Sequence, residues 1–242
     1  MVTAADTFGT PTKRVNELWQ TDFTSIKIQG WGWYYLSTVL DDFSRYILAG
    51  KLTPTMAASE VQDTLELALK ASGLKHIRVR HRPRLLSDNG PAYLSKELRE
   101  YLEAQDIEHT RGAPFHPMTQ GKIERYHRSM KNVVLLENYF LPEALERAIR
   151  SFVEQYNQQR YHESLNNLTP AHVYFGRAKE ILNRREKIKR DTPTARRFTA
   201  QQARRQACPS SIGFRKLKSV SEILFPVPGH RLVRIAFGHV HT

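Results

Sequence analysis

Hydrophobic and polar residues alternate along the first part of the chain in a way that predicts a sheet. The pattern covers residues 18–28, 34–40 and 46–52, and the second stretch follows two glycines. Alternation with a period of two is typical of strands with one buried face, and glycines between two such stretches indicate a hairpin with a wide turn. We therefore expect three adjacent strands, with order beginning near Asn16.

Helical and strand-like stretches alternate after these strands. Apolar residues in 57–70 recur with a helical period, and a short apolar stretch at 84–87 ends at the turn signal Asp88-Asn89-Gly90. Ser95 is placed to cap a helix over 95–104, before a short strand at 107–111. Three adjacent strands followed by strand–helix alternation favour an α/β fold, a mixed sheet with helices on its faces.

The following part of the chain reads as helical after a loop at 112–121. The pattern predicts helices over 122–136 and 141–159, the second opened by Pro142 near its first turn. A further helix is expected from the cap Thr169 to about residue 190.

The charge is concentrated in one segment. The chain carries a net charge of +13, yet residues 1–176 hold 21 Lys and Arg against 20 Asp and Glu, whereas 177–218 hold 14 against 3. Such a basic excess indicates a polyanionic partner, most often nucleic acid. We expect four parts: a loose leader (1–15), a core (16–176), a basic helical or disordered extension (177–206) and a tail of unclear structure (207–242).

The composition excludes several classes of protein. A single cysteine, Cys208, rules out a disulfide framework and a CxxC zinc site. The sequence has no apolar run of roughly 18 residues, so no membrane span is expected. Its start lacks the apolar region of a secretory signal, and a cytoplasmic location is the expectation that follows.

Three acids stand where chemistry could be built. Asp22 lies inside the first strand, Asp88 follows a strand, and Glu124 falls in the first turn of a helix. If the two strands are adjacent, these carboxylates converge and repel, and such oxygen ligands suit Mg²⁺ or Mn²⁺. Two ions about 3.5–4 Å apart would serve phosphoryl transfer. The alternative is that Asp88 forms a turn, Glu124 is an N-terminal helix charge and Asp22 is an edge-strand acid.

The residues around these acids carry a family resemblance. Between Asp88 and Glu124 lie 35 residues. The matching segments are Asp41-Asp42-Phe43-Ser44-Arg45, Ser87-Asp88-Asn89-Gly90, His116 to Arg125, Tyr156-Asn157, Arg160, His162, Leu165 and Thr169-Pro170. Over about residues 16–190 the chain resembles the retroviral-integrase (DDE) catalytic core, as found in bacterial insertion-sequence transposases.

The resemblance implies a fold, a reaction and partners. The fold would be ribonuclease-H-like, a five-stranded mixed sheet flanked by helices, with the basic helical extension after it. Asp22, Asp88 and Glu124 would hold Mg²⁺ or Mn²⁺, as two ions, for in-line attack on DNA phosphodiesters. Water would cleave at the transposon end, and a 3′-hydroxyl would join that end to target DNA. A homo-oligomer on DNA is expected, in the bacterial cytoplasm and on the nucleoid when bound.

The sequence departs from the family pattern in two places. Met118 stands where the family usually has a polar residue, which bears on a DNA contact rather than on the metal site. About fifteen residues precede the first strand, where such transposases usually carry a helix-turn-helix region. This short N-terminal part, together with the changed texture of the sequence after Cys208, motivates an alternative function, a truncated, non-catalytic DNA-binding remnant of a transposase.

Basic residues on and around the Glu124 helix are candidates for DNA contact. Lys131 lies seven residues after Glu124, on the same helix face, with Arg128 between them. His116 could orient DNA or a carboxylate, or be a loop histidine. The alternative for the helix is a solvated amphipathic face, and for the extension a frayed helix. The candidate DNA-binding residues are Lys131, Arg128, His116, Lys122, Arg184, Arg185, Lys187, Lys189 and Arg190.

The remaining aromatic and acidic residues near the first strands are expected to be structural. Asp41 and Asp42 are interpreted as turn acids that pair with Arg45. Trp19, Trp31 and Trp33 are expected to pack in the core and the hairpin rather than to stack on bases.

Overall fold

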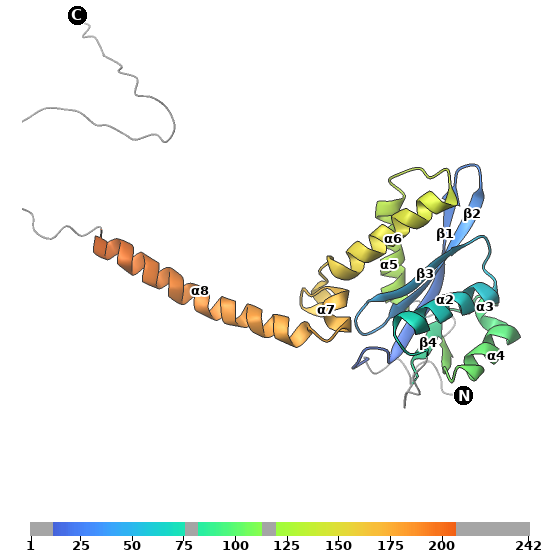
Figure 1. Ribbon diagram of the computed structural model, residues 1–242, viewed down its shortest axis with the longest axis horizontal. Coiled ribbons are helices and arrows are strands. Elements are labelled where there is room, and N and C mark those ends of the chain that lie inside the picture. Colours follow the sequence, from blue (N-terminus) through green and yellow to red (C-terminus); the bar gives the residue numbers. More distant parts are fainter. Residues whose placement is uncertain (1–11, 76–81, 113–119, 207–242) are drawn as a thin grey trace, which may run out of the picture. The chain divides into compact units, whose positions relative to one another are not determined.

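A computed structural model describes residues 12–75, 82–112 and 120–206, and its central feature is a five-stranded sheet (Figure 1). The strand order is β3-β2-β1-β4-β5. The first three strands pair antiparallel, while β4 is parallel to β1 and β5 to β4. The predicted mixed sheet is therefore confirmed. The strands are β1 (Leu18–Ile28), β2 (Gly32–Asp41), β3 (Ile47–Thr53), β4 (Arg84–Ser87) and β5 (His109–Arg111).

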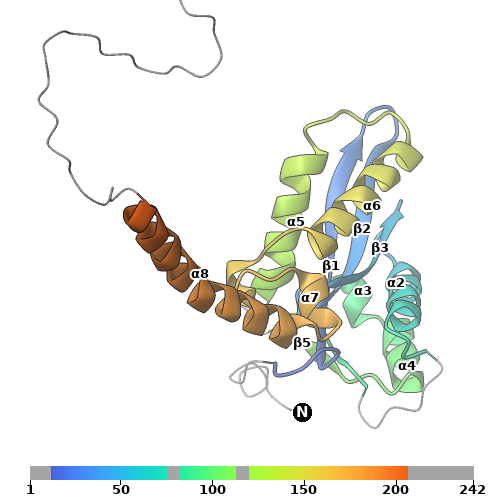
Figure 2. The ribbon, with the colours of Figure 1, turned by 60° about the vertical axis from the view of Figure 1, so that its left-hand side comes forward.

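Helices cover both faces of the sheet (Figures 1 and 2). One face carries α2 (Ala58–Ala71), α3 (Pro91–Leu94) and α4 (Lys96–Ala104), and the other carries α5 (Gly121–Val134) and α6 (Pro142–Gln158). A 3-10 turn, η2 (Glu163–Leu165), precedes α7 (Pro170–Tyr174) and α8 (Ala178–Gln206).

The alternation along β1 sorts its side chains between two apolar clusters. Trp19 is fully buried and packs with residues of α2, α3 and α4, whereas Ile26 and Ile28 pack with α5 and α6. Successive side chains of a strand point to opposite faces. Every even-numbered residue of β1, Asp22 among them, therefore belongs to the face covered by α5.

Several predicted helix starts are confirmed by their capping geometry. Ser95 Oγ accepts a hydrogen bond from the backbone N–H of Leu98, and Pro142 occupies the first turn of α6. Thr169 caps α7 and exchanges capping hydrogen bonds with His172.

The prediction of one continuous helix from Thr169 to about residue 190 is wrong, because the structure has two separate helices there. The first helix, α7, ends at Tyr174, and Gly176 follows with φ of +71°. That backbone conformation is left-handed and suits glycine, which is a common way for a helix to end. A separate helix, α8, begins at Ala178 and contains Pro193.

The chain divides into two compact units, residues 1–187 and 188–242. The sheet and helices α2 to α7 lie in the first unit. In the described ranges, no helix has the length and apolarity needed to cross a membrane.

Candidate active site at the end of strand β4

The register of two parallel strands brings two of the predicted acids to one level of the sheet. Leu18 pairs with Arg84 and Gln20 with Leu86. Continuing that register places Asp22 beside Asp88, immediately beyond the last residue of β4. Burial raises the pKa of the Asp88 carboxyl, and the negative charge of Asp22 raises it further. The two carboxylates therefore lie within electrostatic reach of each other.

The loop that carries Asp88 is fixed by local hydrogen bonds. The backbone N–H of Gly90 donates to Asp88 Oδ1 at 2.9 Å, which opposes the rise in pKa. A Cβ atom at position 90 would lie 3.0 Å from that oxygen, so any larger residue would crowd the carboxylate. Asn89 Nδ2 donates to the carbonyl of Gly112 at 2.9 Å, which ties the loop to the end of β5.

Glu124 is held over β1 by the residues before it on α5. Ile123 is fully buried, and its backbone N–H donates to Gln20 Oε1 at 3.2 Å. Lys122 Nζ forms an ion pair with Asp42 at the end of β2. These two contacts fix the first turn of α5 beside Gln20, which lies two residues before Asp22 on β1. The Glu124 side chain itself is exposed, and a negative charge is favoured at a helix N-terminus.

A shallow depression of about 380 Å³ joins Asp22 and Glu124. The charged residues of α5 along its rim, Glu124, Arg128 and Lys131, recur at the spacing of one helix face. This depression therefore contains two of the predicted acids and two of the predicted DNA contacts. Its lining is Asp22, Thr24, Glu124, His127, Arg128, Lys131 and Asn132.

His127 lies under this depression, and the sequence pattern placed it only among the basic side chains between Glu124 and Lys131, not among the candidate site residues. Its Nδ1 is 3.4 Å from Asp22 Oδ2, and its Nε2 is 3.2 Å from Thr38 Oγ1. Thr38 is the residue directly opposite Asp22 in the β1–β2 ladder. The available signal was the position of His127 three residues after Glu124, on the apolar face of α5 with Ile123 and Met130.

Tyr93 approaches the acid pair from the other face of the sheet. Its hydroxyl is 3.4 Å from Thr21 Oγ1 on β1. Burial raises the pKa of the Tyr93 hydroxyl strongly, and both Asp22 and Asp88 raise it further. Both carboxylates thus lie close enough to the Tyr93 hydroxyl to affect its pKa, which agrees with their neighbouring positions. The sequence pattern did not predict α3, the four-residue helix that carries Tyr93.

The donor set agrees in kind with a hard divalent cation. Asp22 and Asp88 are neighbouring carboxylates with mutual repulsion, and Glu124 shares a depression with Asp22. Carboxylate oxygens are the ligands that Mg²⁺ prefers. Across the described ranges, no three acidic, histidine or cysteine side chains converge as a metal-ligating group.

The other predicted DNA contacts have varied surroundings. His116 lies outside the described residues. Lys122 is engaged with Asp42, while Arg128 is exposed on α5. On α8, Arg185 donates to the carbonyls of Asn166 and Asn167. The other predicted contacts on that helix are exposed, namely Arg184, Lys187, Lys189 and Arg190.

Asp41 and Asp42 are structural acids, as expected. Asp41 accepts hydrogen bonds from the backbone N–H of Asn16 and from the N–H and hydroxyl of Ser44. The carboxylate of Asp42 pairs with Lys122. Arg45 donates instead to the main-chain carbonyl of Asp42, at 2.7 Å.

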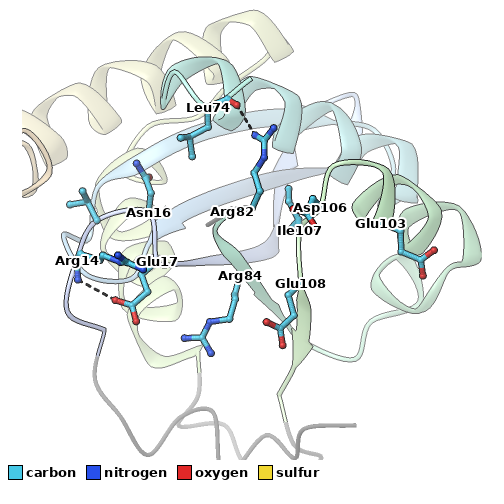
Figure 3. A pocket seen from close by; sticks show the side chains of 11 residues that line it. Arg14, Asn16, Glu17, Leu74, Arg82, Arg84, Glu103, Asp106, Ile107 and Glu108 are labelled. Atoms are coloured by element: carbon cyan, nitrogen blue, oxygen red, sulfur yellow. Dashed lines mark hydrogen bonds between the residues drawn. The ribbon is translucent and has the colours of Figure 1, made fainter. Parts of the chain in front are cut away.

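A large cavity lies at the opposite end of β4 (Figure 3). Its volume is about 920 Å³, and Arg84, the first residue of β4, contributes to its wall. Arginines and carboxylates mix around it, including Arg82, Glu103 and Glu108. Asp88 follows the other end of the strand, so this cavity is separate from the acid pair.

Known proteins match this arrangement in sequence. Two family profiles, both described as "Integrase core domain", match residues 12–117 and 105–170. The chain belongs to the integrase core family. It is 35% identical over 130 residues to the intracisternal A-particle Pol-related polyprotein of the mouse element MIA14, covering 53% of this chain and 14% of that protein. It is 26% identical over 160 residues to the Escherichia coli transposase InsF for insertion sequence IS3A, covering 64% of this chain and 52% of that protein.

Solved structures support the ribonuclease-H-like fold of this integrase core. The integrase catalytic core domain of HTLV-2, solved in complex with magnesium in a dimeric form, has a TM-score of 0.53 and 25% identity, covering 66% of this chain and 97% of that one. A simian T-cell lymphotropic virus intasome in complex with a PP2A regulatory subunit has a TM-score of 0.59 and 24% identity. That match covers 68% of this chain and 56% of the other. The chain thus spans nearly all of an isolated core domain, but about half or less of the curated relatives named above.

Proposed function

We propose that this chain is the catalytic core of a bacterial DDE transposase, which cleaves DNA and joins a 3′-hydroxyl end to target DNA. The observation that carries the proposal is the parallel register of β1 and β4, which sets Asp22 level with Asp88. The anchors of α5 bring Glu124 to the same end of the sheet. The family membership supplies the reaction class, and the E. coli relative is a transposase of an insertion sequence.

Asp22, Asp88 and Glu124 are the residues that would hold Mg²⁺ or Mn²⁺, as two ions. Bound there, the metal would make water or a 3′-hydroxyl a better nucleophile and stabilise the leaving oxygen at phosphorus. In the chain itself, His127 holds one oxygen of Asp22, and the Gly90 N–H holds one oxygen of Asp88. Both contacts orient carboxylates before the metal binds.

The DNA strand would run over the basic rim of the depression. Arg128 and Lys131 lie along the α5 face that also carries Glu124, and side chains of this kind contact phosphates without reading bases. His116, Lys122 and the basic residues of α8 are further proposed contacts, the latter adding affinity for DNA of any sequence. A homo-oligomer on DNA follows from the need to hold two transposon ends together. The proposed location is the bacterial cytoplasm.

The test is metal-dependent nicking and joining, measured on a supercoiled plasmid with a duplex that carries a 3′-hydroxyl end. Asp22→Asn, Asp88→Asn and Glu124→Gln should each lower the rate at least about 100-fold, because each removes a charged ligand. Asp106→Asn and Glu137→Gln are matched controls at exposed acids away from the acid pair, and should retain the wild-type rate. Asp88→Asn should not lower the Tm in EDTA, since burial and Asp22 disfavour its ionised form.

A rate that survives any of the three substitutions, in a variant that folds and binds DNA, would exclude the proposed acid triad. A wild-type chain that binds DNA in a salt-sensitive manner but never nicks or joins it would support the other hypothesis, a DNA-binding remnant.

A further inference from the structure

Three arginines from separate elements gather around Tyr156 on α6. The guanidinium of Arg160 lies over the Tyr156 ring, with Cζ 5.7 Å from the ring centroid. Burial raises the pKa of the Tyr156 hydroxyl to about 12, and the charges of Arg160, Arg45 and Arg125 act against that rise. Arg45 comes from the β2–β3 turn and Arg125 from α5. We call Arg45, Arg125 and Arg160 the arginine cluster.

The cluster holds more positive charge than its surroundings neutralise. Arg45 is partly buried and bonded to a main-chain carbonyl, while the carboxylate of Asp42 is already paired with Lys122. The side chains of Arg125 and Arg160 are exposed, and within the described ranges neither guanidinium forms a hydrogen bond or an ion pair. Burial lowers the pKa of Arg45, and the charge of Arg125 lowers it further. The outer two arginines are therefore available for an external anion.

The base of the cluster is held by side-chain packing and hydrogen bonds. The Tyr156 ring contacts the rings of Tyr126 and His162 at centroid distances of 5.1 and 5.0 Å. The neighbouring Asn157 is hydrogen-bonded to both backbone groups of Ile47. Burial lowers the pKa of His162 to about 4, with Arg160 and Arg45 adding to the effect, so His162 is neutral at pH 7. The positive charge thus comes from the arginines alone.

We propose that Arg125 and Arg160, with Arg45 behind them, bind the phosphodiester backbone of DNA beside the strand that enters the acid site. This inference rests on the proposed function and adds a second DNA contact to it. Arg125 follows Glu124 directly on α5, about 1.5 Å further along the helix axis and about 100° around it. Its side chain therefore belongs to the helix face next to the depression, where a duplex that reaches Glu124 is close at hand. Guanidinium groups suit this ligand because their planar fork matches phosphate oxygens.

The first test measures the salt dependence of DNA binding. Fluorescence anisotropy with a 30-base-pair duplex in EDTA would compare the wild type with Arg125→Gln/Arg160→Gln. Each lost phosphate contact reduces the slope of log K against log salt by about 0.9, so the double variant should lose about 1.8. Arg99→Gln/Arg147→Gln removes two exposed, unpaired arginines from α4 and α6 and should keep a slope within about 0.5 of the wild type.

A second measurement separates a specific contact from general charge. Neutral methylphosphonate linkages, introduced singly along one strand, should weaken wild-type binding most at one or two positions. In Arg125→Gln/Arg160→Gln those positions should show no penalty, while Arg125→Lys/Arg160→Lys should keep most of the slope. The inference is overturned if the Gln variant matches the Arg99/Arg147 control, or if its methylphosphonate profile equals that of the wild type.

The outcomes distinguish this inference from the proposed function. Binding is measured in EDTA, so it does not depend on catalysis, and Asp22→Asn serves as a chain without its acid pair. Loss of slope in the Gln variant, with acid substitutions that leave nicking intact, would support the cluster and refute the acid triad. If the salt slope of Arg125→Gln/Arg160→Gln is unchanged while the three acids prove essential for nicking, only the arginine cluster is refuted.

Discussion

His127 on α5 contacts two neighbouring strands. One of its ring nitrogens is 3.4 Å from Asp22 on β1, and the other is 3.2 Å from Thr38 on β2. The ring is buried, so its orientation is fixed by packing against Tyr126, at a centroid distance of 5.4 Å. A side chain held in this way limits the rotation of the Asp22 carboxylate. Under the proposed function, His127 would act on the chemistry through Asp22, as a positioning residue.

Replacing His127 should weaken metal binding before it affects anything else. Removing a group that orients a ligand typically costs 10- to 100-fold in metal affinity, so His127→Ala should raise the Mn²⁺ dissociation constant about 10-fold. Electron paramagnetic resonance of free Mn²⁺ measures this directly, without DNA. His127→Asn, which keeps an N–H donor, should restore part of the affinity, and Asn132→Ala at the rim of the depression is the control. An unchanged constant in a folded His127→Ala would argue against positioning.

At the scale of residues, the sequence singles out side chains by their spacing and their motifs. Asp22 was singled out inside a strand, Asp88 after a strand and Glu124 in the first turn of a helix, and their catalytic role stays a prediction. Of the three tryptophans expected to pack in the core and the hairpin, Trp19 is fully buried in the core, whereas Trp31 and Trp33 at the hairpin are 55% and 57% exposed. Aromatic residues near a hairpin turn carry no local signal of which face is covered, because that depends on helices distant in sequence.

At the level of elements, Asn157 connects α6 to the start of β3. Its Oδ1 accepts from the backbone N–H of Ile47 at 2.9 Å, and its Nδ2 donates to the Ile47 carbonyl at 3.0 Å. A helix side chain thus makes the two hydrogen bonds that a neighbouring strand would otherwise make. This contact joins the α5–α6 layer to the sheet beside the arginine cluster.

Asn157→Ala should therefore destabilise the fold strongly. It leaves a buried N–H and a buried carbonyl without partners, and each such loss costs about 1–3 kcal/mol, so a decrease of about 2–6 kcal/mol in the free energy of unfolding is expected. Urea unfolding followed by circular dichroism gives the value. The adjacent exposed residue provides the comparison, since Gln158→Ala should change stability by about 0.5 kcal/mol or less. Equal stabilities for the two variants would contradict the role of Asn157.

Periodic elements were predicted well, and short ones were not. The strand at Arg84–Ser87 was predicted with its observed bounds, because its apolar residues end at a turn signal. The helix α3 has four residues and therefore no period to detect. The break between α7 and α8 depends on one glycine in a left-handed conformation, which the flanking helical residues concealed.

Across the whole molecule, positive charge is distributed unevenly. Under the proposed function, the first part of the chain carries the acids of the active site, and the basic segment adds affinity for DNA. The first 176 residues are nearly neutral because their acids offset their bases, whereas 177–218 carry the excess. The basic side chains described on α8 are largely exposed. Neutralising them should therefore weaken DNA binding without altering the acid site.

Lys187→Gln/Lys189→Gln/Arg190→Gln tests this division of roles. Loss of three phosphate contacts should reduce the salt slope of DNA binding by about 2.7, while the nicking rate at saturating DNA stays at the wild-type value. The control Lys13→Gln/Lys70→Gln/Arg99→Gln removes the same charge at exposed positions of the first unit. A nicking rate that falls at saturating DNA would show that α8 contributes to catalysis as well as to affinity.

The parallel pairing of β1 with β4 also sets the order in which the site can assemble. The β1–β2–β3 meander joins segments that are neighbours in sequence, whereas the acid pair joins positions 22 and 88 across a long crossover. Such distant contacts form slowly, because a long loop must close first. A chain that has folded only its meander has not yet brought Asp22 and Asp88 together. Under the proposed function, DNA cleavage would therefore become possible only late in folding, after most of the sheet has formed.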